Sequence, residues 1–316
     1  MREHYITLFN SRYLPQGLAL YTSLLRFAGD FKLWVLCMDR RTHQFFQNEK
    51  FQHIEVIGIW EVEELFPDLV RLKNDRTVAE YCWTLTPFCP ELVFDRDDSV
   101  QRVTYLDADI WFLRSPEPIF QEFEESCKAI LITSHGYAPH WDQSDLCGIF
   151  CVQFLIFTKQ RSSKVLNAWQ KQCLDWCYAK PELGRFGDQK YLDSWPYDYS
   201  DLVHILERQH YCLAPWNVDR FSQNEAIIYH FHGLKILTSN WISLGDYPIP
   251  EVVRHSIYKK YTIDLLQWIE FLSNKKLFSA SSELAVFSSI ANSYVRRIRQ
   301  IFKNLINISN VMKLNG

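Results

Sequence analysis

The sequence has little excess charge, and it contains no hydrophobic run long enough to cross a bilayer. Its 34 Lys and Arg residues nearly balance its 37 Asp and Glu residues, for a formal net charge of −3 at pH 7. Without a broad positive surface, a nucleic-acid partner is not expected. No apolar stretch approaches the roughly 18 residues that a membrane-spanning helix needs, so we expect the body of the chain to be soluble.

Glycine is scarce, at 10 of 316 residues. The segment 10–17, which comes after the first apolar run, therefore lacks the glycine-rich loop with which a nucleotidyltransferase cradles a triphosphate. A recognisable signal peptide is also missing. The nine cysteines are an odd number scattered through apolar segments, which indicates reduced thiols and a cytoplasmic location.

The pattern of apolar residues predicts an α/β fold. Nearly continuous apolar runs at 5–9, 32–38 and 53–59 are typical of strands in a parallel sheet covered by helices on both faces. Further strands are expected at 101–106, 129–133, 150–157, 203–206 and 226–230, and helices at 13–27, 77–92 with an interruption near Pro87, and 162–178. Beyond Pro250 the pattern becomes helical, so we divide the chain into a body, 1–250, and a helical C-terminal extension, 251–316.

Two carboxylates, Asp107 and Asp109, come directly after the predicted strand 101–106. Ligands of open α/β sheets lie at the carboxyl ends of strands, and carboxylate oxygens suit Mg²⁺ or Mn²⁺. An Asp-x-Asp tripeptide also occurs by chance in many surface loops. Here, however, it stands between the apolar runs 103–106 and 110–113, where two charges need a partner.

With Tyr105-Leu-Asp-Ala-Asp109, the chain resembles the GT-A glycosyltransferases, and most nearly their family-8-like, glycogenin-like retaining group. The segments 186–192, which contains Asp188-Gln189, and His230-Phe-His-Gly233 extend the resemblance over roughly residues 5–240. It implies a Rossmann-like, mixed but mostly parallel sheet flanked by helices, a nucleoside-diphospho-sugar donor, first of all a UDP-sugar, and Mn²⁺ or Mg²⁺ as the cofactor.

The resemblance also implies roles for individual residues. Asp107, Asp109 and His230 would hold the metal, and Asp188 and Gln189 would flank the reacting sugar as catalytic residues. Gln153 is the candidate for a contact with the same sugar, although an ordinary place in its strand stays open. The expected contacts to the nucleotide and its diphosphate are Thr7, Asn10, Ser11, Tyr13, Asp39, Arg76, Asp107 and Lys235.

The chain departs from the family pattern at three of these places. Lys235 follows Gly233 by two residues instead of three, and Cys151 stands where many relatives carry a sugar-binding Asn. His232 competes with His230 as the metal ligand, although the spacing to Gly233 favours His230.

Ordinary structural roles stay open for several other candidates. Asp188 is a candidate N-cap of the helix that comes after it, and Arg76 a candidate solvated surface charge. Asp39 is a candidate turn residue at the end of its strand.

Retention at the anomeric carbon is inferred from the resemblance alone, whereas a role in surface-polysaccharide synthesis is inferred from the C-terminal tail. The acceptor would be a saccharide or a lipid-linked saccharide. The last helix places basic side chains among apolar ones, namely Arg296, Arg297, Arg299 and Lys303 among Ile298, Ile301, Phe302 and Leu305. That mixture is typical of a helix lying on anionic lipid at the inner face of the cytoplasmic membrane, although packing on the body or dimerisation is an alternative.

The remaining alternatives for the whole chain are a nucleotidyltransferase and a catalytically inactive saccharide-binding or scaffold protein of the same fold. The combination of Asp107, Asp109, Asp188 and His230 argues against an inactive protein, which has no need of all four. The sequence leaves the oligomeric state open.

Overall fold

The computed structural model describes residues 2–238, 241–278 and 311–313. Its central sheet has seven strands in the order β3-β2-β1-β4-β7-β6-β8. The strands are β1 Glu3–Phe9, β2 Phe31–Cys37, β3 Ile54–Gly58, β4 Arg102–Leu106, β6 Ile130–Ser134, β7 Phe150–Thr158 and β8 Val203–Ile205. β7 runs antiparallel to β4 and β6, and the other pairs are parallel. The predicted mixed, mostly parallel sheet is therefore confirmed.

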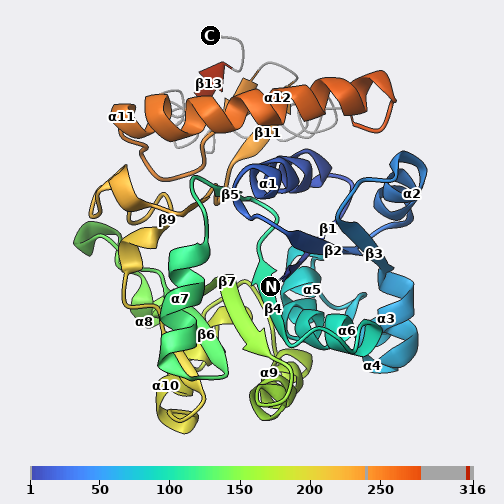
Figure 1. Cartoon of the computed structure of the whole chain (residues 1–316), viewed down its shortest axis with the longest axis vertical. Coiled ribbons are helices and arrows are strands. Elements are labelled where there is room, and N and C mark those ends of the chain that lie inside the picture. The colour runs from blue at the N-terminus through green and yellow to red at the C-terminus, as the bar shows by residue number, and fades with distance from the viewer. Residues whose placement is uncertain (1, 239–240, 279–310, 314–316) are drawn as a thin grey trace, which may run out of the picture.

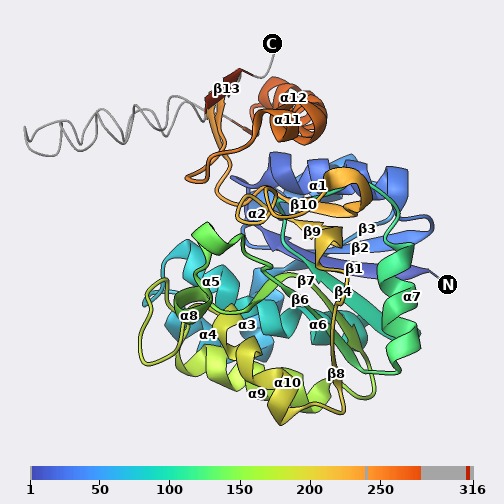
Figure 2. The ribbon, with the colours of Figure 1, turned by 90° about the vertical axis from the view of Figure 1, so that its left-hand side faces the viewer.

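Helices cover both faces of this sheet, as Figure 2 shows. Alternate side chains of a strand point to opposite faces: in β2, Leu33 and Val35 enter one core cluster, whereas Trp34 and Leu36 enter the other. One face is covered by α1 Leu14–Phe27, α2 Arg40–Glu49 and α7 Glu117–Ser126. The other face is covered by α3 Ile59–Leu65, α4 Pro67–Leu72, α5 Val78–Leu85, α6 Cys89–Arg96, α9 Ser163–Asp175 and α10 Trp195–Asp198.

Pro87 interrupts the predicted helix 77–92 as expected. A single 3₁₀ turn, Thr86–Phe88, separates α5 from α6, because proline has no N–H to continue the helical hydrogen bonds. The break matters for the site, since Thr86 lies at the wall of the cavity described below.

Two small three-stranded sheets extend the body. The first consists of β5 Ile110–Phe112, β10 Ile228–His230 and β9 Cys212–Leu213, and the second of β11 Lys235–Thr238, β12 Trp241–Ser243 and β13 Val311–Lys313. The short helix α8 Ser144–Cys147 lies between β6 and β7, and α11 Glu251–Val253 leads through a π-helical turn into α12 Lys259–Asn274. Short 3₁₀ helices lie at Pro139–Trp141, Gln189–Ser194, Gln209–Tyr211 and Gln223–Glu225.

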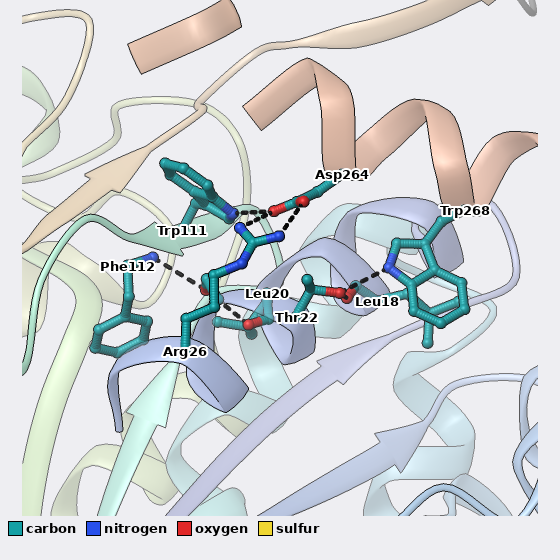
Figure 3. A network of polar contacts seen from close by, with 9 residues as sticks. Leu18, Leu20, Thr22, Arg26, Trp111, Phe112, Asp264 and Trp268 are labelled. Carbon is teal, nitrogen blue, oxygen red and sulfur yellow. Dashed lines mark hydrogen bonds and ion pairs between the residues drawn. The ribbon is translucent and has the colours of Figure 1, made fainter. Parts of the chain in front are cut away.

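Helix α12 lies across α1 (Figure 1). The Asp264 carboxylate of α12 is buried; it accepts hydrogen bonds from Arg26 of α1 at 2.7 Å and from the indole N–H of Trp111 of β5 at 2.9 Å (Figure 3). Trp268 donates to Thr22 Oγ1 at 2.9 Å. The part of the predicted extension that the structure describes is thus tied to the first helix of the body.

The predicted basic and apolar helix around Arg296–Lys303 lies outside the described residues. Lys313 is the last residue of β13, which pairs with β12. In the part of the chain that the structure describes, no helix combines the length and the apolar character that crossing a membrane requires.

Candidate metal centre and donor cavity

The two aspartates of the predicted metal motif occupy a turn between two sheets. β4 ends at Leu106, the turn residues Asp107, Ala108 and Asp109 come next, and β5 begins at Ile110. Ile110 N–H donates to the Asp107 carbonyl at 3.2 Å, which closes the turn. Both carboxylates therefore lie at the carboxyl end of a central strand, where ligands of α/β sheets bind.

Strand pairing brings His230 to these aspartates. β10 pairs antiparallel with β5 so that His230 lies opposite Ile110, and Phe231 N–H donates to the Asp109 carbonyl at 2.9 Å. The imidazole Nε2 lies 3.1 Å from Asp109 Oδ1 and 3.7 Å from Asp107 Oδ2. One ligand atom from each of the three residues lies within 4.8 Å of the others. In the described part of the chain, this is the one such group of three or more His, Cys, Asp or Glu residues.

Neighbouring side chains orient two of the three groups. Tyr105 donates from its hydroxyl to Asp107 Oδ1 at 3.0 Å, and His230 Nδ1 lies 2.9 Å from Gln153 Oε1. Protein metal sites commonly have such outer partners, which fix the orientation of the ligands. Two carboxylates and one imidazole with outer hydrogen bonds fit a hard divalent cation, with the imidazole mildly favouring Mn²⁺ over Mg²⁺.

The proximity of like charges alters the acidities of the cluster. Desolvation, together with the charge of Asp109, raises the pKa of Asp107 to about 6, although His230 opposes the shift. Burial alone would lower the pKa of His230, but the charge and hydrogen bond of Asp109 raise it well above its usual value. A positive charge in the space between these groups is thus electrostatically favoured.

A cavity of about 830 Å³ opens beside this cluster, within the size range of small-molecule sites. Asp107, Asp109, His230 and His232 line it, and so do Asp188 and Gln189. His232 is exposed and is not part of the three-residue group. The structure therefore places His230, the ligand that the spacing favoured, between the carboxylates.

Of the predicted nucleotide-binding residues at the first two strand ends, some line the cavity and others have structural contacts. Asn10 and Tyr13 line the cavity. Asp39 instead caps α2 and joins the two strand ends: it accepts hydrogen bonds from Ser11 N–H and Oγ and from Thr42 N–H and Oγ1. Although burial opposes the shift, these hydrogen bonds lower the pKa of Asp39. Thr7 is fully buried in β1 and does not line the cavity.

Asp188 and Gln189 both reach the cavity. Burial, together with the charge of Asp107, raises the pKa of Asp188 to about 7. Its Oδ2 has no hydrogen-bond partner among the described residues, and its side chain makes no capping bond to the 3₁₀ turn that begins at Gln189. Asp188 thus occupies the N-cap position that the sequence allowed, but its side chain does not cap the turn. Gln189 donates from Nε2 to the Cys147 carbonyl at 2.8 Å.

Three further predicted site residues, in addition to Thr7, Ser11 and Asp39, do not line the cavity. Arg76 is buried and donates to Thr84 Oγ1, to the Cys173 carbonyl at 2.7 Å and to the Leu174 carbonyl at 2.9 Å. It therefore stabilises the end of α9 and is not a solvated surface charge. Lys235 is exposed at the start of β11. Gln153 is fully buried, and its side chain contacts His230.

Sequence reasoning missed two features of the cavity. Arg12 is the one Lys or Arg among the described residues that line it, and it stands inside the segment 10–13 that the resemblance already marked. The second feature is an uncharged aromatic wall of the cavity, formed by Tyr137, Trp216 and Tyr247. Their rings lie 6.2 Å apart in successive pairs, and no motif or spacing in the sequence connects them.

No family model matches the chain. It is similar to two uncharacterized proteins of Bacillus subtilis (strain 168). YfnD is 26% identical over 284 residues, which cover 84% of this chain and 90% of YfnD. YfnF is 28% identical over 297 residues, which cover 86% of this chain and 95% of YfnF.

Among solved structures, the chain is similar to the galactosyltransferase LgtC, solved in complex with donor and acceptor sugar analogues. The TM-score is 0.52 at 10% identity, over 83% of this chain and 95% of LgtC. The glycosyltransferase GlyE of Streptococcus pneumoniae TIGR4 gives a TM-score of 0.51 at 12% identity, over 89% of this chain and 66% of GlyE. The protein thus has the mixed α/β fold of GT-A-like glycosyltransferases.

Proposed function

We propose that this protein is a metal-dependent glycosyltransferase that moves a sugar from a nucleoside-diphospho-sugar to a saccharide acceptor. The observation that carries the proposal is the cluster of Asp107, Asp109 and His230 at the wall of a large cavity beside a central strand end. The fold shared with LgtC and GlyE supports it. A UDP-sugar is the first donor to test.

The charged residues of the cavity suit a diphosphate only together with a cation. Asp107, Asp109 and Asp188 are acidic, and Arg12 is the one basic Lys or Arg side chain among the described lining residues. A bound Mn²⁺ or Mg²⁺ would supply the positive charge that stabilises the departing diphosphate. Asp107, Asp109 and His230 hold that cation, and Arg12 adds a charge at the nucleotide end of the cavity.

Other lining residues contact the donor sugar and the acceptor. Asp188 and Gln189 flank the sugar, where a buried carboxylate stabilises a positively charged, oxocarbenium-like carbon. The aromatic wall of Tyr137, Trp216 and Tyr247 offers uncharged faces for the acceptor saccharide. Retention at the anomeric carbon, in the manner of family 8, is inferred from the resemblance, and NMR of the first-formed product anomer tests it.

The donor site is tested by thermal shift. Nucleoside diphosphates and their sugars are added with and without Mn²⁺ to the wild type and to Asp109→Ala. We expect one nucleotide to stabilise the wild type only with Mn²⁺, by about 2.7 kcal/mol at one hundred times its dissociation constant, and the variant to lose this effect. If no nucleotide stabilises the wild type with Mn²⁺ present, the protein is a binding or scaffold protein of this fold.

A role in surface-polysaccharide synthesis, with a lipid-linked acceptor at the inner face of the cytoplasmic membrane, is the cellular context that we propose. The basic and apolar pattern of residues 296–305 supports it. Flotation with vesicles separates this role from a purely soluble one. Anionic vesicles, but not neutral ones, should carry the full chain, and a chain ending at residue 278 should stay behind.

A further inference from the structure

Gln153 contacts two of the three candidate metal ligands from a single position on β7. Its backbone carbonyl accepts a hydrogen bond from Asp107 N–H at 3.2 Å, and its side-chain Oε1 lies 2.9 Å from His230 Nδ1. The residue is fully buried and is not part of the cavity wall, although its neighbours Cys151 and Val152 are. It therefore lies behind the site.

The contact with Oε1 determines which imidazole nitrogen faces the carboxylates. An amide oxygen only accepts hydrogen bonds, so Nδ1 must carry the proton that it donates to Gln153. Nε2 lies 3.1 Å from Asp109 and 3.7 Å from Asp107, and a cation that replaces the Nε2 proton shared with Asp109 would meet the Nε2 lone pair there. The ring with its proton on Nδ1 is the tautomer that a metal-binding imidazole needs.

We propose that Gln153 is a positioning residue of the metal site, which holds His230 in the metal-binding tautomer and Asp107 in register, and that it does not contact the donor sugar. This inference rests on the proposed function, because it requires that the cluster binds a cation. It replaces the sugar contact that the resemblance implied for Gln153.

The burial of Gln153 supports such a role independently. Its Nε2 is buried and has no hydrogen-bond partner among the described residues, and an unsatisfied buried donor costs about 1–3 kcal/mol. A leucine of similar volume would avoid that cost within an otherwise apolar strand. The amide thus lowers the stability of the fold, and the bond to His230 is the function that explains a glutamine at this position.

The proposal is tested by measuring Mn²⁺ affinity by calorimetry on the full chain. Gln153→Leu removes the acceptor for Nδ1–H and should weaken Mn²⁺ binding about 10–100-fold, the usual loss for an outer partner of a ligand. Gln153→Glu keeps an acceptor oxygen and should bind Mn²⁺ more tightly than the leucine variant. Thr104→Val is the matched control, because Thr104 is buried on the adjacent strand β4 and its hydroxyl has no partner among the described residues. Its affinity should equal that of the wild type.

A spectroscopic measurement separates positioning from a general loss of stability. Pulsed EPR of bound Mn²⁺ detects the ¹⁴N coupling of a directly coordinated imidazole. We expect that coupling in the wild type, in Thr104→Val and in Gln153→Glu. In Gln153→Leu saturated with Mn²⁺ it should be weakened or lost, because the ring is free to turn or to carry its proton on Nε2.

Two results would overturn the inference. If Gln153→Leu binds Mn²⁺ as tightly as the wild type and with the same ¹⁴N coupling, the amide does not position His230. If, in addition, only the KM for the donor rises, Gln153 contacts the sugar after all. If the wild type binds no Mn²⁺, the proposed metal site and this inference both fail. If the wild type binds Mn²⁺ and Gln153→Leu binds it equally well, only this inference fails.

Discussion

At the residue scale, the arrangement of His230 and His232 gives a direct prediction about the metal. His230 is buried, with Nε2 close to both carboxylates, whereas His232 is exposed outside the three-residue group. We expect His230→Gln to lower Mn²⁺ affinity by at least about 100-fold, the upper end of the loss for an outer partner. His232→Gln should change it by less than about threefold. Calorimetric titration measures both, and equal losses would contradict the assignment.

The cysteines give a prediction about reactivity and pH. Burial raises the pKa of Cys147, which lines the cavity, although the charge of Lys190 opposes the shift. A raised pKa leaves less thiolate at pH 8, so iodoacetamide should alkylate Cys147 slowly there and faster as the pH rises toward that pKa. The exposed Cys127 should react first at pH 8. Peptide mass spectrometry of a time course measures the order, and preferential labelling of Cys147 at pH 8 would be inconsistent with its burial.

The residues that could be predicted from the sequence are those that a local motif marks. Asp107 and Asp109 come after a strand within one short segment, and Asp188-Gln189 and His230 belong to segments with a recognisable order. The contacts of Arg76 could not be predicted, because its acceptors belong to a helix that is distant in the sequence. They are the carbonyls of Cys173 and Leu174. Gln153 could not be placed either, since its partner His230 lies 77 residues away.

At the element scale, the junction of α1, α12 and β5 predicts an asymmetric effect of two substitutions. Arg26→Met leaves the Asp264 carboxylate buried, with Trp111 as its remaining donor, and should cost about 3–5 kcal/mol. Asp264→Leu leaves Arg26 nearly half exposed, so its guanidinium can reach water. The cost should then be about 1–2 kcal/mol, mainly because the buried Trp111 N–H loses its acceptor. Urea unfolding at 25 °C measures both.

The double variant is the control for this pair. If the side chains interact, Arg26→Met together with Asp264→Leu should cost clearly less than the sum of the single changes. Additive costs would mean that α12 is held on α1 by apolar packing and by the bond between Trp268 and Thr22, without a contribution from the ion pair.

Strands and helices of the central layer were predictable because a buried strand needs a continuous apolar run. The predicted runs 5–9, 32–38 and 150–157 correspond to β1, β2 and β7 with ends displaced by at most two residues. The short strands β5, β9 and β11 were missed. Two to four residues carry no periodicity. β5 and β9 form because β10, which is distant in the sequence, pairs with both of them, and β11 forms by pairing with the next strand, β12. The position of His230 depends on one such pairing, that of β10 with β5.

At the scale of the whole molecule, the proposed boundary near residue 250 leads to a prediction about truncation. Helix α12 and the turn before it bury Tyr258, Tyr261, Leu265, Ile269 and Leu272 in the cores that include α1 and β10. Burial of each such side chain contributes about 1.5–3 kcal/mol. Their sum is comparable with the roughly 5–15 kcal/mol by which a typical protein is stable.

A chain that ends at residue 250 should therefore fail to unfold cooperatively and should expose apolar surface, whereas one that ends at residue 278 should keep a cooperative transition. The longer truncation is the matched control, because it keeps α12 with Asp264 and Trp268 and removes residues 279–316, β13 among them. Thermal unfolding observed by near-ultraviolet circular dichroism, with binding of an apolar dye, distinguishes the two. If the chain ending at residue 250 unfolds cooperatively near the wild-type temperature, residues 251–316 form a separable extension. If it does not, α12 is part of the body that places the metal centre, since β5 and β10 lie between that helix and the cavity.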